Sequence, residues 1–312
     1  AVYHKHNGMK KIEREDLYIL SQHSDLSEEL ADKVLREQIY SDKAAWQKFM
    51  RLLFISLAFG FSISGIVFFF AYNWADLHKF AKIGITEAAL IGTTLLALHP
   101  KINSSIRPII LTAAAALVGV LFAVFGQVYQ TGANAYDFFL AWTLFISVWV
   151  FLTNYPPLSL LYWVLINTTL ILYTQQVAKD WSPVFVFMLL FLLNVALLTA
   201  AYLLSIYKSP VKMPTWFLYC IAIAAASFAT IGMLFAIFDS YVLSIPIFIV
   251  AIATAYGFAL LQAVESKRAF YLALIPLSLI IIASGFLSKI ADSEGMFLLI
   301  SLFIIAAITM TI

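Results

Sequence analysis

The sequence predicts an all-α fold, a polytopic transmembrane helix bundle of about ten spans that follows a small N-terminal cytoplasmic helical module. Composition gives the first indication, because 63% of the 312 residues are apolar and only 12% are charged, far outside the range of soluble domains. Apolar runs of about 20 residues recur from residue 51 to residue 312, and each can cross about 30 Å of hydrocarbon as a helix. These runs lack the alternating pattern of a membrane β-barrel, so the spans must be helices.

Two short segments precede the first span. Residues 1–8 are expected to be the remnant of an expression tag. Residues 9–48 form the amphipathic module, in which Ser27 can cap a helix with Leu30 and Val34 on one face. Two interpretations stay open: a helical hairpin docked on the inner membrane surface, or a module that binds a cytoplasmic protein partner through residues 10–45.

The rest of the chain, residues 49–312, is predicted to be one transmembrane helical domain. A helix that continues from the module forms the first span and ends at Asn73-Trp74. Nine further spans are expected at about 80–98, 107–130, 135–153, 157–176, 183–205, 215–237, 241–262, 269–287 and 295–312. Short loops make sequential spans antiparallel neighbours. No polar flank follows the last apolar run, so we expect the domain to be truncated at its C-terminal end.

Basic residues set the orientation of these spans. The loops that follow the second, sixth and eighth spans lie on the side of the N-terminal module, which is itself rich in Lys and Arg. These loops contain Lys101, Arg107, Lys208, Lys212, Lys267 and Arg268. The opposite side carries fewer: Lys79, Lys82, Lys179 and Lys289. By the positive-inside rule, the N-terminus is cytoplasmic and the third span ends on the outer face.

An internal repeat relates the third and seventh spans. Residues 116–125 read ALVGVLFAVF and residues 229–238 read ATIGMLFAIF, with six identical positions at an offset of 113 residues. Both contain a stripe of small residues at helical spacing, centred on Gly119 and Gly232, which lets helices approach closely. Convergent packing and an ancient parallel duplication both explain the repeat.

Polar side chains gather at three outward helix ends, and they are the candidate ligand-binding residues: Gln127, Tyr129, Gln130, Asn73, Trp74, Asn134, Asp137 and Asp239. If the small-residue stripes pack the first, third and seventh spans together, these ends converge on one outward-facing cavity. The alternative is that the polar groups only satisfy helix ends, where Trp and Tyr are also expected.

Other polar residues fall inside predicted spans. Glu87 is a candidate site for proton or cation coupling, since a carboxyl within the bilayer must be paired, protonated or turned inward; a hydrogen bond to a neighbouring helix would serve equally. Asn167 and Asn194 lie near the middle of consecutive antiparallel spans, so a direct carboxamide pair is predicted. Cys220 is expected to be a buried structural thiol.

Several classes of function lack support in the sequence. No basic stripe exists for nucleic acid. Phosphate-binding loops, HExxH motifs and nucleophile elbows are missing, and His78 beside Asp76 is the only weak hint of a hydrolase, so an enzyme is not favoured. We expect no cofactor, and the dispersed histidines predict no metal site.

The stretch Gly126-Gln127-Val128-Tyr129-Gln130-Thr131-Gly132, with Asn73-Trp74 and the helical N-terminal module, resembles a bacterial family of membrane proteins catalogued as domain of unknown function twenty-one fifty-seven. The resemblance is firmest over about residues 12–150. It implies a multi-pass protein of the bacterial inner membrane with a cytoplasmic N-terminal region. The family supplies no activity, substrate or catalytic residue.

Together these patterns predict a carrier, flippase or binding protein for a small polar or amphiphilic molecule, such as a lipid, that enters an outward-facing polar cavity. The contacts of such a protein are the lipid bilayer and its ligand. The competing hypothesis is a non-transporting scaffold or envelope sensor that acts through the N-terminal module.

Overall fold

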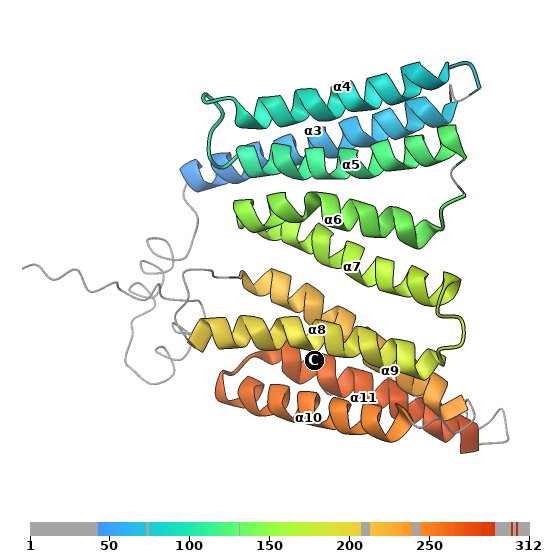
Figure 1. The fold of residues 1–312 in the computed structure, drawn as a ribbon. Helices are drawn as coiled ribbons and strands as arrows, with labels where there is room; N and C mark the ends of the chain where they lie inside the picture. Colours follow the sequence, from blue (N-terminus) through green and yellow to red (C-terminus); the bar gives the residue numbers. More distant parts are fainter. Residues whose placement is uncertain are drawn as a thin grey trace, which may run out of the picture.

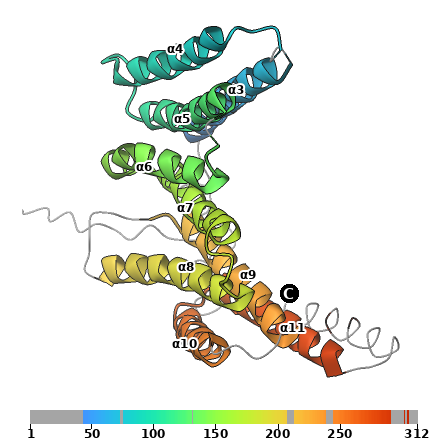
Figure 2. The same cartoon turned by 45° about the vertical axis from the view of Figure 1, so that its right-hand side comes forward.

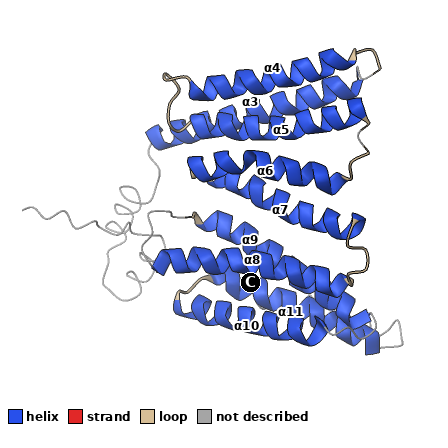
Figure 3. Cartoon of the chain, viewed as in Figure 1, coloured by secondary structure: helices blue, strands red, loops and turns tan. Residues whose placement is uncertain are grey.

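The structure, a computed structural model, describes residues 43–72, 75–130, 132–206, 213–238, 244–290, 301 and 304. Nine helices run through these residues: α3 (Lys43–Tyr72), α4 (Lys79–Leu98), α5 (Arg107–Tyr129), α6 (Ala135–Thr153), α7 (Pro156–Gln176), α8 (Pro183–Ile206), α9 (Thr215–Phe238), α10 (Ser244–Glu265) and α11 (Ala269–Ile290). Each is long and apolar enough to cross a membrane, and the described ranges contain no strand (Figure 3). The predicted all-α transmembrane bundle is confirmed. The N-terminal module and most of the expected tenth span lie outside the described residues.

Local sequence explains where several helices begin and end. Proline occupies the first turn of α5 and α7, where its missing N–H costs no intrahelical hydrogen bond. At the other end, α6 stops at Asn154, which adopts the left-handed conformation with φ of 46°. Lys267 adopts the same conformation (φ of 51°) in the short turn between α10 and α11. These stops keep most loops short, and several sequential helices are antiparallel neighbours, as α4 is with α5, α6 with α7 and α8 with α9 (Figure 1).

The helices stand side by side in an elongated row rather than in a round bundle (Figures 1 and 2). One end of the row is formed by α3, α4 and α5, with α5 packed on both of the others, and α6 and α7 come next. The other end is a closed ring in which α8 contacts α9, α9 contacts α11, α11 contacts α10, and α10 contacts α8. Among the described helices, α7 makes the main connection, with light contacts to α8 and α9.

The two repeated helices each pack closely, but not on each other. A Cβ atom at Gly119 of α5 would lie 2.5 Å from the ring of Trp142 in α6, and one at Gly232 of α9 would lie 2.6 Å from the ring of Phe248 in α10. Each glycine is therefore covered by an aromatic ring of the following helix. The condition for a shared outward-facing cavity, that the first, third and seventh spans pack together, is not met by the described helices, because α5 belongs to one end of the row and α9 to the other.

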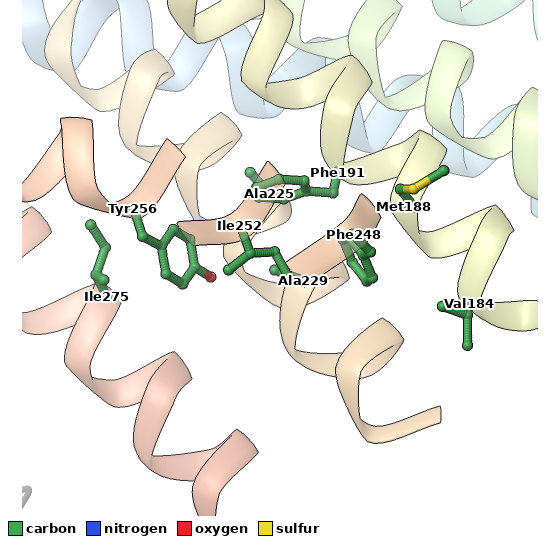
Figure 4. Close-up of a cluster of buried hydrophobic side chains, with 9 residues drawn as sticks. All are labelled: Val184, Met188, Phe191, Ala225, Ala229, Phe248, Ile252, Tyr256 and Ile275. Atoms are coloured by element: carbon green, nitrogen blue, oxygen red, sulfur yellow. The ribbon is translucent and has the colours of Figure 1, made fainter. Parts of the chain in front are cut away.

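Two apolar clusters form the buried parts of this row. One lies between α5, α6 and α7 and includes Val118, Ile146 and Leu165. The other lies within the ring of α8 to α11 and is drawn in Figure 4, where Phe191, Phe248 and Tyr256 point into the space between the helices. Cys220 is exposed on α9 and not buried as expected, because that side of the helix faces away from the ring.

Candidate functional site

The Gly126–Gly132 stretch ends α5 and turns the chain toward α6. Tyr129 is the last helical residue, Gln130 follows in the left-handed conformation (φ of 46°), and Gly132 is left-handed as well (φ of 64°). The side chains of Gln127, Tyr129 and Gln130 are exposed. Neither carboxamide forms a side-chain hydrogen bond to the described part of the chain. In the described residues, α5 therefore ends at Tyr129, with Gln130 as a left-handed C-cap.

The next two candidate residues begin α6. The Asn134 backbone N–H donates to Oδ2 of Asp137 over 3.1 Å, which places a carboxylate at the positive end of the helix. One residue earlier than Asp137, the Tyr136 N–H donates to Oε1 of Gln176 over 3.0 Å and so ties the start of α6 to the end of α7. These contacts are the helix-end satisfaction that was one of the two interpretations for Asn134 and Asp137.

The remaining candidates are not gathered beside them. Asn73, Trp74 and Asp239 lie outside the described residues. Glu87 is exposed on α4, the outermost helix of the row (Figure 1). Since α9 packs on α8 and α11 at the far end of the row, its end is separated from those of α3 and α5.

A cavity of about 820 Å³ lies elsewhere, inside the ring of α8, α9, α10 and α11. Its wall is mostly apolar and rich in alanine, with Ala222, Ala225 and Ala226 from α9 facing Ala255 and Ala259 from α10. These small side chains leave space between the helices, whereas larger residues such as Met188 and Phe248 fill the buried cluster of the same ring. A cavity of this size is typical of small-molecule sites.

The cavity has a polar mouth at the ends of the four helices. Gln262, Ser266 and Arg268 line it from the end of α10 and the turn that follows. This turn is fixed by backbone hydrogen bonds from Lys267 N to Val264 O (3.3 Å) and from Arg268 N to Ala263 O (2.9 Å). The guanidinium of Arg268 is exposed and forms no ion pair with a described residue.

The floor of the cavity is apolar and closed by the ring of Tyr256. Phe191, Ala225 and Ile275 complete this floor, and each is at least nine-tenths buried. In Figure 4 the Tyr256 ring lies between Ile275 and Ile252, with its hydroxyl directed away from Ile275. The hydroxyl is 2.8 Å from Oγ of Ser278, which is in turn 2.7 Å from Oγ1 of Thr230.

The predicted carboxamide pair is confirmed and joins the two parts of the row. Asn194 Nδ2 donates to Oδ1 of Asn167 over 2.8 Å, and Trp163 Nε1 donates to Oδ1 of Asn194 over 2.7 Å. Asn167 and Asn194 also donate to backbone carbonyls of their own helices, so the network is satisfied. It links α7 to α8, where the two parts of the row have few other contacts.

Sequence reasoning missed the cavity, although its residues carry a signal. The alanines of α9 and α10 repeat at helical spacing, as in the stripes that were recognised, and a basic pair follows α10. The sequence does not show that four helices pack into a ring. Only that arrangement places these alanines around a shared space. Within the described ranges, no group of three or more His, Cys, Asp or Glu residues could hold a metal ion.

The fold therefore defines a multi-span, all-helical membrane protein. Residues 24–159 match the model of a family described as "Predicted membrane protein (DUF2157)". The family resemblance seen in the sequence is thereby confirmed over a stretch that runs from the N-terminal module to the start of α7, less than half of the chain. The cavity lies beyond that stretch. No curated protein and no solved structure matched the chain in these comparisons.

Proposed function

We propose that this protein binds a small amphiphilic molecule in the cavity of α8 to α11 and acts as a binding protein, carrier or flippase for it. The cavity is the single observation that carries the proposal. It has an apolar wall, a closed apolar floor and a polar mouth, and its volume of about 820 Å³ suits a small molecule. The class of ligand is the one expected from the sequence, but the site differs from the predicted outer cluster.

The position of the mouth favours an amphiphile over a fully polar ligand. Because the mouth lies at helix ends, it opens at the boundary between hydrocarbon and head groups, where amphiphiles are concentrated. A polar metabolite would leave its own polar groups unpaired against the alanine wall, which costs free energy. An apolar chain loses nothing there and gains burial.

We further propose that the mouth faces the cytoplasmic side of a bacterial inner membrane. The loops at that end carry Lys101, Lys267 and Arg268, and the sequence between α8 and α9 contains Lys208 and Lys212. The opposite end, with Gln127, Tyr129 and Gln130, then faces outward. We propose that these three residues contact lipid head groups on that side, at a place separate from the cavity.

The row of helices supports movement of a ligand as well as binding. Within the described residues, the two parts of the row meet mainly through α7, so each can shift against the other without breaking a large interface. Such a joint is what alternating access to a site requires.

Filling the cavity tests the proposal. The full chain, reconstituted in phosphatidylcholine nanodiscs, is incubated with a spin-labelled stearate, and binding is measured for Ala259→Phe and Ala253→Phe. Ala259 lines the cavity, whereas Ala253 lies exposed on the outer side of the same helix. We expect at least a tenfold loss for Ala259→Phe and none for Ala253→Phe, with both variants eluting as the parent protein. Equal binding by all three proteins would exclude the cavity as the site.

A further inference from the structure

We propose that the ligand of this cavity is an anionic amphiphile that inserts chain first, with its head group held by Arg268. The inference rests on the proposed function, because it assigns the charge and the direction of the molecule that the cavity binds. It follows from the hydrogen bonds at the two ends of the cavity.

The floor has no hydrogen-bond donor to offer. Thr230 Oγ1 donates to the Ala226 carbonyl over 2.7 Å, so its only hydrogen is in use and it must accept from Ser278. The Ser278 hydroxyl therefore donates its hydrogen to Thr230 and must accept a hydrogen bond from Tyr256. All three hydroxyl hydrogens are committed within this chain.

An anionic head group at the floor would therefore meet the rings of Tyr256 and Phe191, aliphatic side chains such as Ile275, and a tyrosine oxygen whose hydrogen is already in use. None of these stabilises a negative charge, and a buried unpaired charge is strongly unfavourable. An apolar chain end, in contrast, finds a closed apolar surface formed by buried side chains. The inner end of the cavity thus selects the chain of the ligand.

The mouth offers the opposite chemistry. Arg268 presents a fork of N–H donors that matches a carboxylate or a phosphate, and no described acidic side chain is paired with it. The Gln262 carboxamide lines the same rim and adds donors. Glu265, on the outer side of the last turn of α10, is exposed and does not line the cavity.

The depth of the cavity sets the chain length that it accepts. Tyr256 at the floor and Glu265 at the end of α10 are nine residues apart, which is about 14 Å of helix rise, and Arg268 follows in the turn at the mouth. A chain gains burial with each methylene until it reaches the floor, and further methylenes stay outside. Affinity should rise about fourfold per methylene and then level off.

The test compares three head groups on one chain. Palmitate, hexadecyl phosphate and hexadecanol compete with the bound spin-labelled stearate in the same nanodiscs, for the parent protein, Arg268→Gln and Lys267→Gln. Lys267 is the matched control, because it carries the same charge in the same turn but does not line the cavity.

We expect one or both anions to bind at least tenfold more tightly than the alcohol. Arg268→Gln should remove this preference and leave the alcohol unchanged, while Lys267→Gln keeps the preference. Equal binding of anions and alcohol by the parent protein would overturn the inference and leave the proposed function intact. An equal loss in both variants would overturn it too, since attraction by any nearby positive charge would then suffice. If the labelled stearate itself fails to bind, the proposed function is refuted.

Discussion

Replacing Asn194 by leucine should weaken the joint between the two parts of the row. Leucine has the same branching and the same number of side-chain heavy atoms as asparagine, so the change removes hydrogen bonds without opening a hole. Two bonds between side chains are lost, one to Asn167 and one from Trp163, at 2.8 Å and 2.7 Å. At about 0.6 kcal/mol each on average and up to about 1.7, the free energy of unfolding should fall by roughly 1 to 3 kcal/mol.

The assay is reversible unfolding of the full chain in mixed micelles with increasing dodecyl sulfate, followed by tryptophan fluorescence. A double-mutant cycle with Trp163→Phe isolates the bond between Trp163 and Asn194, and its coupling energy should be about 0.6 to 1.7 kcal/mol. Thr254→Val serves as the control, because the exposed Thr254 hydroxyl donates only to Val250 of its own helix. If Asn194→Leu is as mild as this control, or the coupling is below about 0.3 kcal/mol, the network does not hold the two parts together.

Three further changes test other parts of the structure. Gly119→Ala should cost about 1 to 3 kcal/mol of unfolding free energy, since its Cβ would lie 2.5 Å from the Trp142 ring, while Gly257→Ala, with open space around it, should cost nothing. Comparable values for the two would contradict the close packing of α5 on α6. Gln130→Gly should raise the unfolding free energy by about 1 kcal/mol, because glycine adopts φ of 46° without strain; a loss would indicate that the carboxamide has a partner. Tyr256→Phe should lower the melting temperature slightly, through one lost hydrogen bond, and leave binding of anionic amphiphiles unchanged; weaker binding would show that the hydroxyl faces the ligand.

The helices could be predicted from the sequence almost to their ends. Each apolar run is set apart by prolines, asparagines or charged residues that stop a helix locally, and α6 was placed at its observed bounds, Ala135–Thr153. The bond between Asn167 and Asn194 could be predicted for a similar reason. Two carboxamides at the same depth in consecutive antiparallel helices have no better partner within the hydrocarbon.

The cavity and the neighbours of α9 could not be predicted in this way. The small-residue stripes of α5 and α9 predict close packing of another helix. The structure shows such packing at Gly119 and Gly232. The identity of the partner depends on which aromatic side chain of another helix fits the gap, here Trp142 or Phe248, and a single sequence does not encode that choice locally. The polar residues around Gln127 were ambiguous for another reason: the end of any membrane helix needs polar groups, whether or not a ligand binds there.

The length of α3 has a mechanical consequence. Its 30 residues without a break make a rod of about 45 Å, which exceeds the hydrocarbon thickness of about 30 Å by several turns. The start of the rod at Lys43 therefore either stands clear of the bilayer or tilts the whole helix. A force applied to the chain just before Lys43 would act on one end of this unbroken helix, and α3 contacts α5. A rotation of α3 imposed outside the bilayer would therefore be transmitted directly to α5, the helix that contains Gly126 and Tyr129.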